Sequence, residues 1–173
     1  MAGPQQTRKI QQALDLAVQN HTAGRLSQAD TIYQQILQSH PDQPHALHLL
    51  GTIAHQMGKN DVAVDQITRA LHLKPDYVEA HNNLGAALQD LGKLEEAVAS
   101  YRKALAIKPE YAEVHRSLGN ALREFGKLED ALVAHRKALS LKPDFAEAHS
   151  NLGNVLRELA KLEEATVSYR KAL

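Results

Sequence analysis

Three features are missing from this 173-residue sequence: cysteine, a long apolar segment and a net charge. The absence of cysteine excludes disulfide bonds and metal sites built on thiolates. No run of about 18 apolar residues occurs, so the sequence predicts no membrane-spanning helix. Lysine and arginine together number 20, as do aspartate and glutamate, whereas a nucleic-acid-binding surface needs a clustered basic excess. We therefore expect no nucleic-acid partner and no membrane partner.

The first nine residues, 1–9, are polar and lack the apolar core of a signal peptide. We expect them to form a frayed N-terminal extension ahead of the first helix. A cytoplasmic location is the default expectation for such a chain.

What the sequence does contain is a repeat with a step of 34 residues. Three sets of positions keep this step: Pro41, Pro75, Pro109 and Pro143; the pairs Leu50-Gly51, Leu84-Gly85, Leu118-Gly119 and Leu152-Gly153; and Ala29, Ala63, Ala97, Ala131 and Ala165. No linker or low-complexity segment interrupts the array, which covers residues 10–173. We predict five units, 10–43, 44–77, 78–111, 112–145 and a truncated last one, 146–173.

Each unit is predicted to fold as two helices joined by a tight turn. In the third unit the first helical stripe contains Ala80, Leu84, Ala87, Leu88 and Leu91. The second stripe contains Leu94, Ala97, Val98, Tyr101, Ala104 and Leu105. Gly92 lies between the stripes and can adopt the left-handed conformation that ends a helix. Ala160 replaces this glycine in the fifth unit, at an expected cost of about 1 kcal/mol.

Acidic residues near the start of the first helices predict how these helices begin. Asp76 with Glu79, and Asp144 with Glu147, have the spacing of a capping box. We therefore expect the two aspartates to cap the first helices of the third and fifth units.

The glycines of the Leu-Gly pairs have a different predicted role. Gly85 and Gly119 lie within predicted helices, where a phosphate-binding loop cannot form. We expect their missing side chains to let the second helix approach closely, through Ala97 or Ala131. Leu118 is expected to be buried.

At this spacing the units resemble the tetratricopeptide repeat (TPR), a 34-residue helix–turn–helix unit with Leu-Gly, Ala, an aromatic residue, Ala and Pro in a fixed order. The third unit shows this pattern as Leu84-Gly85, Ala97, Tyr101, Ala104 and Pro109. The resemblance extends from about residue 10 to residue 173. It implies an all-α fold, a right-handed superhelical solenoid of helix–turn–helix repeats.

Some positions depart from the family pattern. The large aromatic residue near the start of the first helix is replaced in the last three units by His81, His115 and His149, which we expect to pack against the preceding helix. The phrases HNNLG, HSNLGN, GKLEEA and YRKAL most resemble the TPR region of O-linked N-acetylglucosamine transferases and their bacterial relatives.

Motifs of enzymes and metal sites are absent. The sequence has no HExxH pair, no nucleophile elbow and no glycine-rich nucleotide-binding loop. His45 and His48 are three residues apart, but no carboxylate lies between them, which argues against a zinc site. We predict that the chain is not an enzyme and uses no metal and no cofactor.

A polar stripe follows the first helix of each unit, beside the apolar one. In TPR arrays this face lines the concave groove, and the resemblance assigns it to peptide binding. Lysine is absent from the stripe while Asn, Ser and Thr recur, which suits a groove that a ligand backbone enters closely. The alternative interpretation is a polar, solvent-exposed face. The candidate groove residues are His48, Thr52, His55, Glu79, Asn82, Asn83, Gln89, Glu113, Arg116, Asn120, Arg123, Glu147, Asn151, Asn154 and Arg157.

The sequence thus predicts a scaffold that binds a partner protein or an extended peptide in this groove. Its asparagines, among them Asn83, have both donors and an acceptor for a ligand backbone. Two alternatives are open: the N-terminal substrate-recognition region of a larger enzyme such as a glycosyltransferase, and a self-assembling structural module. The last helix has no capping helix after it, so we also expect weak homo-association through its apolar residues.

Overall fold

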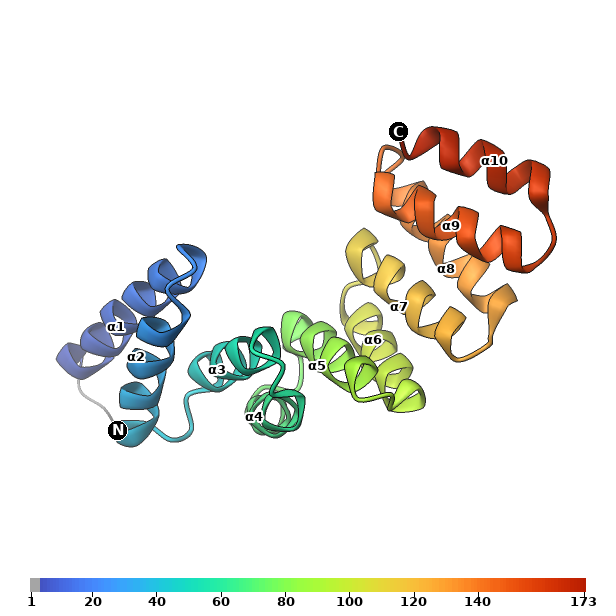
Figure 1. The fold of residues 1–173 in the computed structure, drawn as a ribbon. Coiled ribbons are helices and arrows are strands. Elements are labelled where there is room, and N and C mark those ends of the chain that lie inside the picture. The colour runs from blue at the N-terminus through green and yellow to red at the C-terminus, as the bar shows by residue number, and fades with distance from the viewer. Residues whose placement is uncertain (1–3) are drawn as a thin grey trace. The chain divides into compact units, whose positions relative to one another are not determined.

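The computed structural model describes residues 4–173. Over this range the chain forms ten α-helices and no β-strand (Figure 1). The helices come in consecutive pairs: α1 (Pro4–Thr22) with α2 (Leu26–Ser39), α3 (Pro44–Gln56) with α4 (Asn60–Leu73), α5 (Val78–Asp90) with α6 (Leu94–Ile107), α7 (Ala112–Glu124) with α8 (Leu128–Leu141), and α9 (Ala146–Glu158) with α10 (Leu162–Lys171). The prediction of an all-α solenoid of helical repeats is confirmed.

The first helix begins earlier than the sequence analysis predicts. α1 begins at Pro4, so residues 4–9 are helical and do not form a frayed lead; residues 1–3 lie outside the described range. Proline is favoured at the first position of a helix, because its missing N–H would have no partner there. Neither glycine nor proline follows until Gly24, so no helix-breaking residue separates this segment from the rest of α1.

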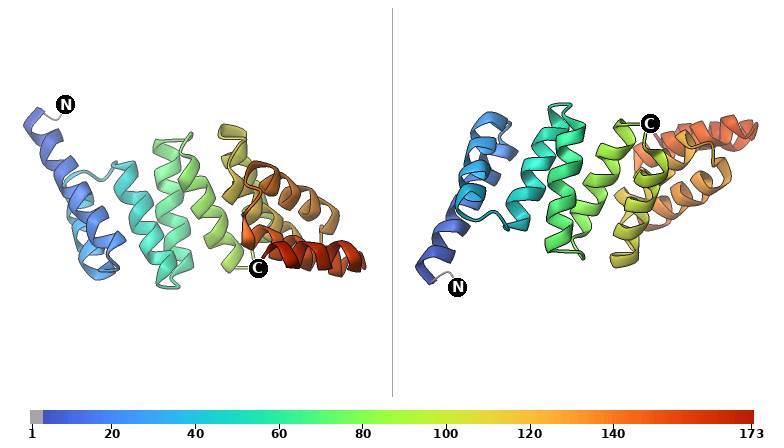
Figure 2. Two further views of the ribbon diagram at one scale, coloured as in Figure 1. Left: turned by 90° about the horizontal axis from the view of Figure 1, so that it is seen from above. Right: turned by 90° about the horizontal axis from the view of Figure 1, so that it is seen from below.

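The chain divides into two compact units, one ending at Ala87 and the other beginning at Leu88. In the first unit, α2 packs against α1 and α3, and α3 packs against α4. In the second unit, α7 packs against α6 and α8, and α9 packs against α8 and α10. These neighbours can be followed within each unit in Figure 2. Each helix therefore buries its apolar stripe against helices that are near it in the sequence, as in other repeat proteins.

The alanine that recurs in every second helix is buried in each repeat. Ala29, Ala63, Ala97 and Ala131 have no exposed surface, and Ala165 is 3% exposed. Such a small side chain leaves room for the neighbouring helix to approach. Leu118 is also buried, as predicted.

The turn within each helix pair has the left-handed backbone that the sequence predicts. Gly24, Gly58, Gly92 and Gly126 have φ angles between 72° and 76°. Ala160 has a φ of 59° at the equivalent position, where a Cβ atom is disfavoured. The turn of the last repeat is therefore formed despite its unfavourable residue.

The mid-helix glycines make room for a different side chain from the one predicted. A Cβ atom built on Gly119 would lie 2.5 Å from the imidazole of His135, and one on Gly153 would lie 2.6 Å from the ring of Tyr169. The predicted close approach of the second helix is confirmed at Gly119, and the atoms nearest to the built Cβ belong to His135 and not to Ala131. The ring one turn further along α8 fills this space.

The predicted capping box is wrong at Asp144. The N-cap residue of α9 is Phe145, and no side chain makes a hydrogen bond to the cap. Phe145 is buried, and the guanidinium of Arg116 lies 5.5 Å from the centroid of its ring. Burial of this ring fixes the start of the helix, which leaves Asp144 one residue ahead of the cap. Asp76 has the same relation to Tyr77, which directly precedes α5.

The histidines near the start of the last three first helices contact the loop before them. The Nε2 atoms of His81, His115 and His149 lie 2.8, 2.9 and 2.8 Å from the carbonyl oxygens of Pro75, Pro109 and Pro143, respectively. Because a carbonyl only accepts, each Nε2 carries a proton and donates it. This loop contact is more specific than the predicted packing against the preceding helix.

Candidate functional site

The predicted groove residues form two groups, which belong to different compact units. In the unit that ends at Ala87, His48, Thr52 and His55 lie on α3, and Glu79, Asn82 and Asn83 lie on α5. In the unit that begins at Leu88, Gln89 lies at the end of α5, Glu113, Arg116, Asn120 and Arg123 lie on α7, and Glu147, Asn151, Asn154 and Arg157 lie on α9. The two groups differ in how their side chains are paired.

His48 is the centre of a hydrogen-bond network in the first group. Its Nδ1 lies 2.9 Å from Tyr77 Oη, and its Nε2 lies 2.9 Å from Asn83 Nδ2. Asn83 Nδ2 also donates to Thr52 Oγ1, 3.1 Å away. An amide nitrogen only donates, so His48 Nε2 accepts and the Nδ1–H group donates to Tyr77. Both amide hydrogens of Asn83 are therefore used within the protein.

Burial keeps His48 in the neutral form that this network requires. The residue is 4% exposed, and burial lowers its pKa to about 4, with further lowering by the charges of His45 and His21. The ring of Tyr77 meets His45 and His48 edge-on, with centroids 5.2 and 4.6 Å away. Burial also raises the pKa of Tyr77 to about 12, so its hydroxyl stays protonated. The sequence pattern does not assign Tyr77 to the site, although a buried tyrosine usually has a partner for its hydroxyl.

The rest of the first group has little donor capacity for a ligand. Thr52 Oγ1 donates to the backbone carbonyl of His48, 2.9 Å away. Asn82 Nδ2 donates to Asn83 Oδ1, 3.3 Å away. Asn82 Oδ1 is buried and has no partner among the described residues. Of this group, Glu79 is the exposed charged residue.

Side chains 35 residues apart connect successive first helices. The pairs, with their nitrogen–oxygen distances, are His21 and Gln56 (3.0 Å), Gln89 and Glu124 (2.7 Å), and Arg123 and Glu158 (2.9 Å). The side chains of Arg123 and Glu158 are 32% and 35% exposed, so this ion pair contributes about 0–1 kcal/mol. Gln89 and Arg123 are therefore paired within the protein, and half-buried His55 directly precedes Gln56 on α3.

Some charged side chains of the second group contact other residues of the protein, and others are exposed. The Arg116 guanidinium lies over the ring of Phe145, and its Nε atom is buried without a partner among the described residues. Glu113 Oε1 lies 3.6 Å from Lys142 Nζ, and both side chains are half exposed. The exposed charged members are Glu113, Glu147 and Arg157.

Three asparagines on α7 and α9 retain polar atoms that a ligand can use. Asn120 and Asn151 are half-buried and make no hydrogen bond with a described residue. Asn154 Oδ1 accepts a hydrogen bond from Tyr169 Oη, 2.9 Å away, while its Nδ2 is neither paired in the described part of the chain nor buried. A carboxamide provides two donors and an acceptor, so these side chains can pair with a peptide backbone.

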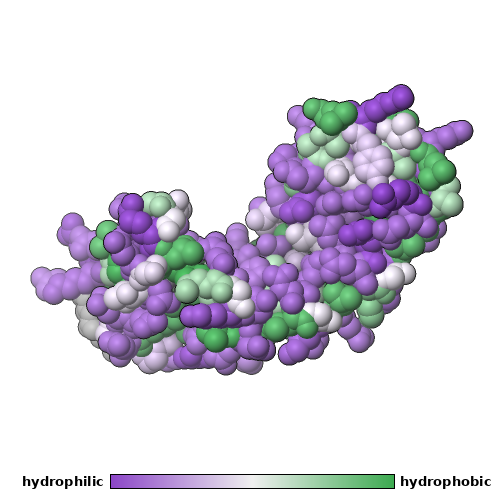
Figure 3. Space-filling view, in the orientation of Figure 1, coloured by the Kyte–Doolittle hydropathy of each residue, from purple (hydrophilic) through white to green (hydrophobic). Residues whose placement is uncertain are grey.

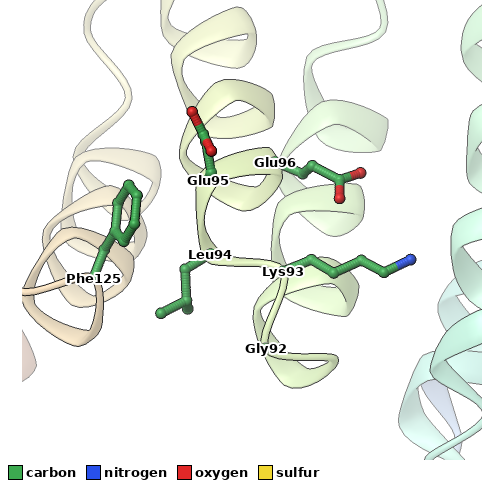
Figure 4. Close-up of a pocket in the computed structure, with 6 residues that line it drawn as sticks. All are labelled: Gly92, Lys93, Leu94, Glu95, Glu96 and Phe125. Carbon is green, nitrogen blue, oxygen red and sulfur yellow. The ribbon is translucent and has the colours of Figure 1, made fainter.

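The surface hollow in Figure 4 does not include these asparagines. It lies in the second unit and is lined by Gly92, Lys93, Leu94, Glu95, Glu96 and Phe125. Leu94 extends toward the side on which Phe125 lies, whereas Lys93 and Glu96 extend away from it (Figure 4). Polar side chains thus do not converge there as they do in small-molecule sites. On the face shown in Figure 3 the surface is mainly hydrophilic, with apolar residues in separate spots.

Within residues 4–173, no group of three or more histidine, aspartate or glutamate residues is arranged to hold a metal ion. None of the helices over the same range is long and apolar enough to cross a membrane.

The paired helices, the buried alanines and the polar faces of the first helices define a helical-repeat protein of the solenoid class. A TPR repeat model matches residues 51–92, 87–124 and 119–159, and two further tetratricopeptide repeat models match residues 10–42 and 146–173. The chain belongs to the tetratricopeptide-repeat family, whose repeats generally mediate protein–protein interaction.

Solved structures share this fold. A crystal structure of MamA has a TM-score of 0.82 and 24% identity, covering 90% of this chain and 91% of its own. The MamA 41-end structure from Desulfovibrio magneticus RS-1 has a TM-score of 0.86 and 21% identity, covering 95% and 93%. A thermophilic TPR protein in Thermus thermophilus has a TM-score of 0.77 and 27% identity, covering 95% and 90%. Among curated proteins, none matches the sequence.

Proposed function

We propose that this scaffold binds an extended peptide segment of a partner protein and that α7 and α9 make the main contacts. The observation that carries this proposal is a set of amide groups with unpaired atoms on two first helices that pack on each other, namely Asn120, Asn151 and the Nδ2 of Asn154. Packed helices lie about 8–10 Å apart, and an extended chain rises about 3.3 Å per residue. One helix would then meet roughly every third ligand residue.

We infer that the polar residues of the first group have a mainly structural role within their own unit. Both donors of Asn83 are used by His48 and Thr52, so Asn83 has a structural role in place of the predicted ligand contact. Exposed Glu79 can still attract a basic ligand residue. In the second group, Arg157 favours an acidic residue and Glu147 a basic one, by the same argument.

A pair of double variants tests which face binds. Asn120→Ala with Asn151→Ala removes two unpaired amides from α7 and α9. Lys103→Ala with Lys137→Ala is the matched control, since both lysines are exposed on second helices. The probe is an array of random peptides of about 12 residues, which span about 40 Å when extended. We expect the asparagine variant to weaken binding by about 1–3 kcal/mol in total, with unchanged helix content and with normal binding by the lysine variant. The reverse result would contradict the assignment to the first helices.

We also propose that the chain has no catalytic activity of its own. Its most buried paired histidine, His48, bonds to side chains of the fold in place of a reacting group. The resemblance to O-linked N-acetylglucosamine transferase repeats has no support from the comparisons, so a substrate-recognition role beside a glycosyltransferase stays a prediction, as does a cytoplasmic location. Glycosyl transfer by the purified chain would contradict the proposed lack of activity.

Weak association between copies through α10 is a second candidate function. Leu162 is 63% exposed and Val167 is 52% exposed on this helix, and exposed apolar residues favour association. We expect a polar helix appended after Leu173 to lower the mean mass measured by light scattering over a dilution series. An unchanged mass at every concentration would remove the support for this function.

A further inference from the structure

One position of the second helix recurs at the 34-residue step, and in three repeats its side chain lies against the mid-helix glycine of the first helix. In the five repeats it is occupied by Tyr33, Ile67, Tyr101, His135 and Tyr169. Where this residue is a tyrosine in the second compact unit, its hydroxyl bonds to an amide of the same repeat. Tyr169 Oη donates to Asn154 Oδ1 at 2.9 Å, and Tyr101 Oη lies 3.2 Å from Gln89 Oε1.

The other two polar residues at this position have no such contact. The hydroxyl of Tyr33 is buried without a partner among the described residues. His135 is fully buried, and neither of its ring nitrogens has a partner in the same range. Asn120 lies in the repeat of His135 at the position that Asn154 has in the repeat of Tyr169, and it is not held.

The tyrosine contact determines which atoms of Asn154 face a ligand. An amide oxygen only accepts, so the Tyr169 hydroxyl donates and turns Oδ1 toward the second helix. Nδ2 lies on the other side of the planar carboxamide, and it is neither buried nor paired within the described residues. Asn154 therefore presents N–H donors, whereas Asn83 has used both of its donors inside the protein.

We propose that Tyr169 is a positioning residue that makes Asn154 a donor-only contact for an acceptor oxygen of an extended peptide. This inference rests on the proposed peptide-binding function. It adds that, in one contact, the protein donates the hydrogen bond and the ligand accepts it. Arg157, three residues further along α9 and exposed, is on a neighbouring helical position and also only donates. The charge of Glu158 on the same helix is compensated by Arg123, 2.9 Å away. This part of α9 thus suits an acceptor such as a backbone carbonyl or a carboxylate.

The test compares Tyr169→Phe with Tyr33→Phe on the random peptide array described above. Tyr169→Phe keeps the ring that packs on Gly153 and removes the hydroxyl. Tyr33→Phe removes a hydroxyl that holds no other side chain. We expect Tyr169→Phe to weaken peptide binding about three- to tenfold, the effect of one hydrogen bond, and Tyr33→Phe to leave it unchanged.

A second measurement separates positioning from a purely structural effect. The side-chain amide signals of Asn154 in an NMR spectrum should shift in Tyr169→Phe and stay in place in Tyr33→Phe. His135→Tyr introduces the same contact into the preceding repeat. The new hydroxyl would lie next to Asn120 as the hydroxyl of Tyr169 lies next to Asn154. We expect His135→Tyr to strengthen binding by a similar factor.

Asn154→Asp identifies the source of the acceptor oxygen. The change replaces the donors by a carboxylate, so a ligand carboxylate would be repelled and acidic peptides would lose more affinity than neutral ones. An equal loss for both classes indicates a backbone carbonyl.

The outcomes also separate this inference from the proposed function. An array on which wild type binds nothing contradicts peptide binding itself. Peptides that bind wild type and Tyr169→Phe equally well contradict the positioning role alone, as does an unmoved Asn154 amide signal.

Discussion

The two compact units are built from the same repeat, yet they pair the polar residues of their first helices differently. In the unit that ends at Ala87, Asn83 gives both amide hydrogens to neighbouring side chains. In the unit that begins at Leu88, Asn151 occupies the same repeat position and makes no hydrogen bond with a described residue. His48 lies against Tyr77 in the first unit, whereas Arg116 lies over a phenylalanine at the same positions in the second.

This difference shows that the positions that form the core of the repeat are distinct from the polar positions, which differ between the two units. Ala63 and Ala131 occupy one repeat position, one in each unit, and both are fully buried. Apart from His48, the polar positions are not fully buried, so the first unit can satisfy them internally while the second leaves amides open. The same scaffold thus provides a face with His48, His55 and one exposed carboxylate, Glu79, in one unit, and a more highly charged face with open amide groups in the other.

Of the changes predicted here, the loss of core packing in one unit should have the largest effect on the free energy of unfolding. Leu118 is buried in the second unit, so Leu118→Ala should lower the free energy of unfolding by about 2–5 kcal/mol. We expect hydrogen exchange to accelerate more in α7 and its neighbours α6, α8 and α9 than in α1, because the contacts are between neighbouring helices. Melting of the variant at the wild-type temperature would show that Leu118 does not contribute to the core.

Acid should destabilise both units through one buried histidine in each. Burial lowers the pKa of His48 and of His135 to about 4, with further lowering by nearby positive charges. Below about pH 6.5 these histidines bind protons in the unfolded chain but not in the folded chain. The free energy of unfolding therefore has its full value above pH 6.5 and falls as the pH decreases toward 4. Between pH 7 and pH 5 we expect a loss of about 2 kcal/mol per histidine.

Urea titrations at several pH values measure this slope. His135→Phe keeps a ring in the space beside Gly119 and removes one of the two titrating groups, so it should remove about half of the pH dependence over this range. A slope equal to that of the wild type would contradict the assignment of the slope to His135.

Removal of equivalent asparagines from the two units compares their polar faces directly. Asn83→Ala leaves the buried Nε2 of His48 without its donor, so we expect a loss of about 1–3 kcal/mol. Asn151→Ala removes a side chain that has no partner among the described residues, so its effect on stability should lie within about 0.5 kcal/mol. Thermal unfolding of both variants is the measurement, and equal losses would contradict the difference between the units.

The helices and their core contacts could be predicted because each repeat restates the same local rules. Leu118, Gly92 and the buried alanines follow from helical spacing and from the turn, which depend on residues close in sequence. The cap at Asp144 could not be predicted in this way, because burial of Phe145 against Arg116 decides where α9 begins.

The pairing of the candidate site depends on contacts between repeats. Asn83 and His48 are 35 residues apart, and the 34-residue period alone does not show which atoms of such a pair face each other. The sequence therefore identified the polar face but assigned the same ligand-binding role to Asn83 and Asn151. The hydroxyl group of a tyrosine whose ring packs in the fold, as in Tyr77 and Tyr169, was the available signal for their hydrogen bonds to the site.

The smallest expected effect concerns the turn of the last repeat. Ala160 holds a φ of 59°, whereas Gly126 has the same left-handed turn in the preceding repeat. Ala160→Gly should raise the free energy of unfolding by about 0.5–1 kcal/mol, because the clash of the Cβ atom with the backbone is removed. Gly126→Ala should lower it by a similar amount, and nothing lies within 4 Å of a Cβ built there, so the backbone alone accounts for the change. Opposite shifts of the melting temperature in the two variants would support this account. A loss of stability in Ala160→Gly would instead mean that the greater freedom of glycine in the unfolded chain outweighs the relief of the turn.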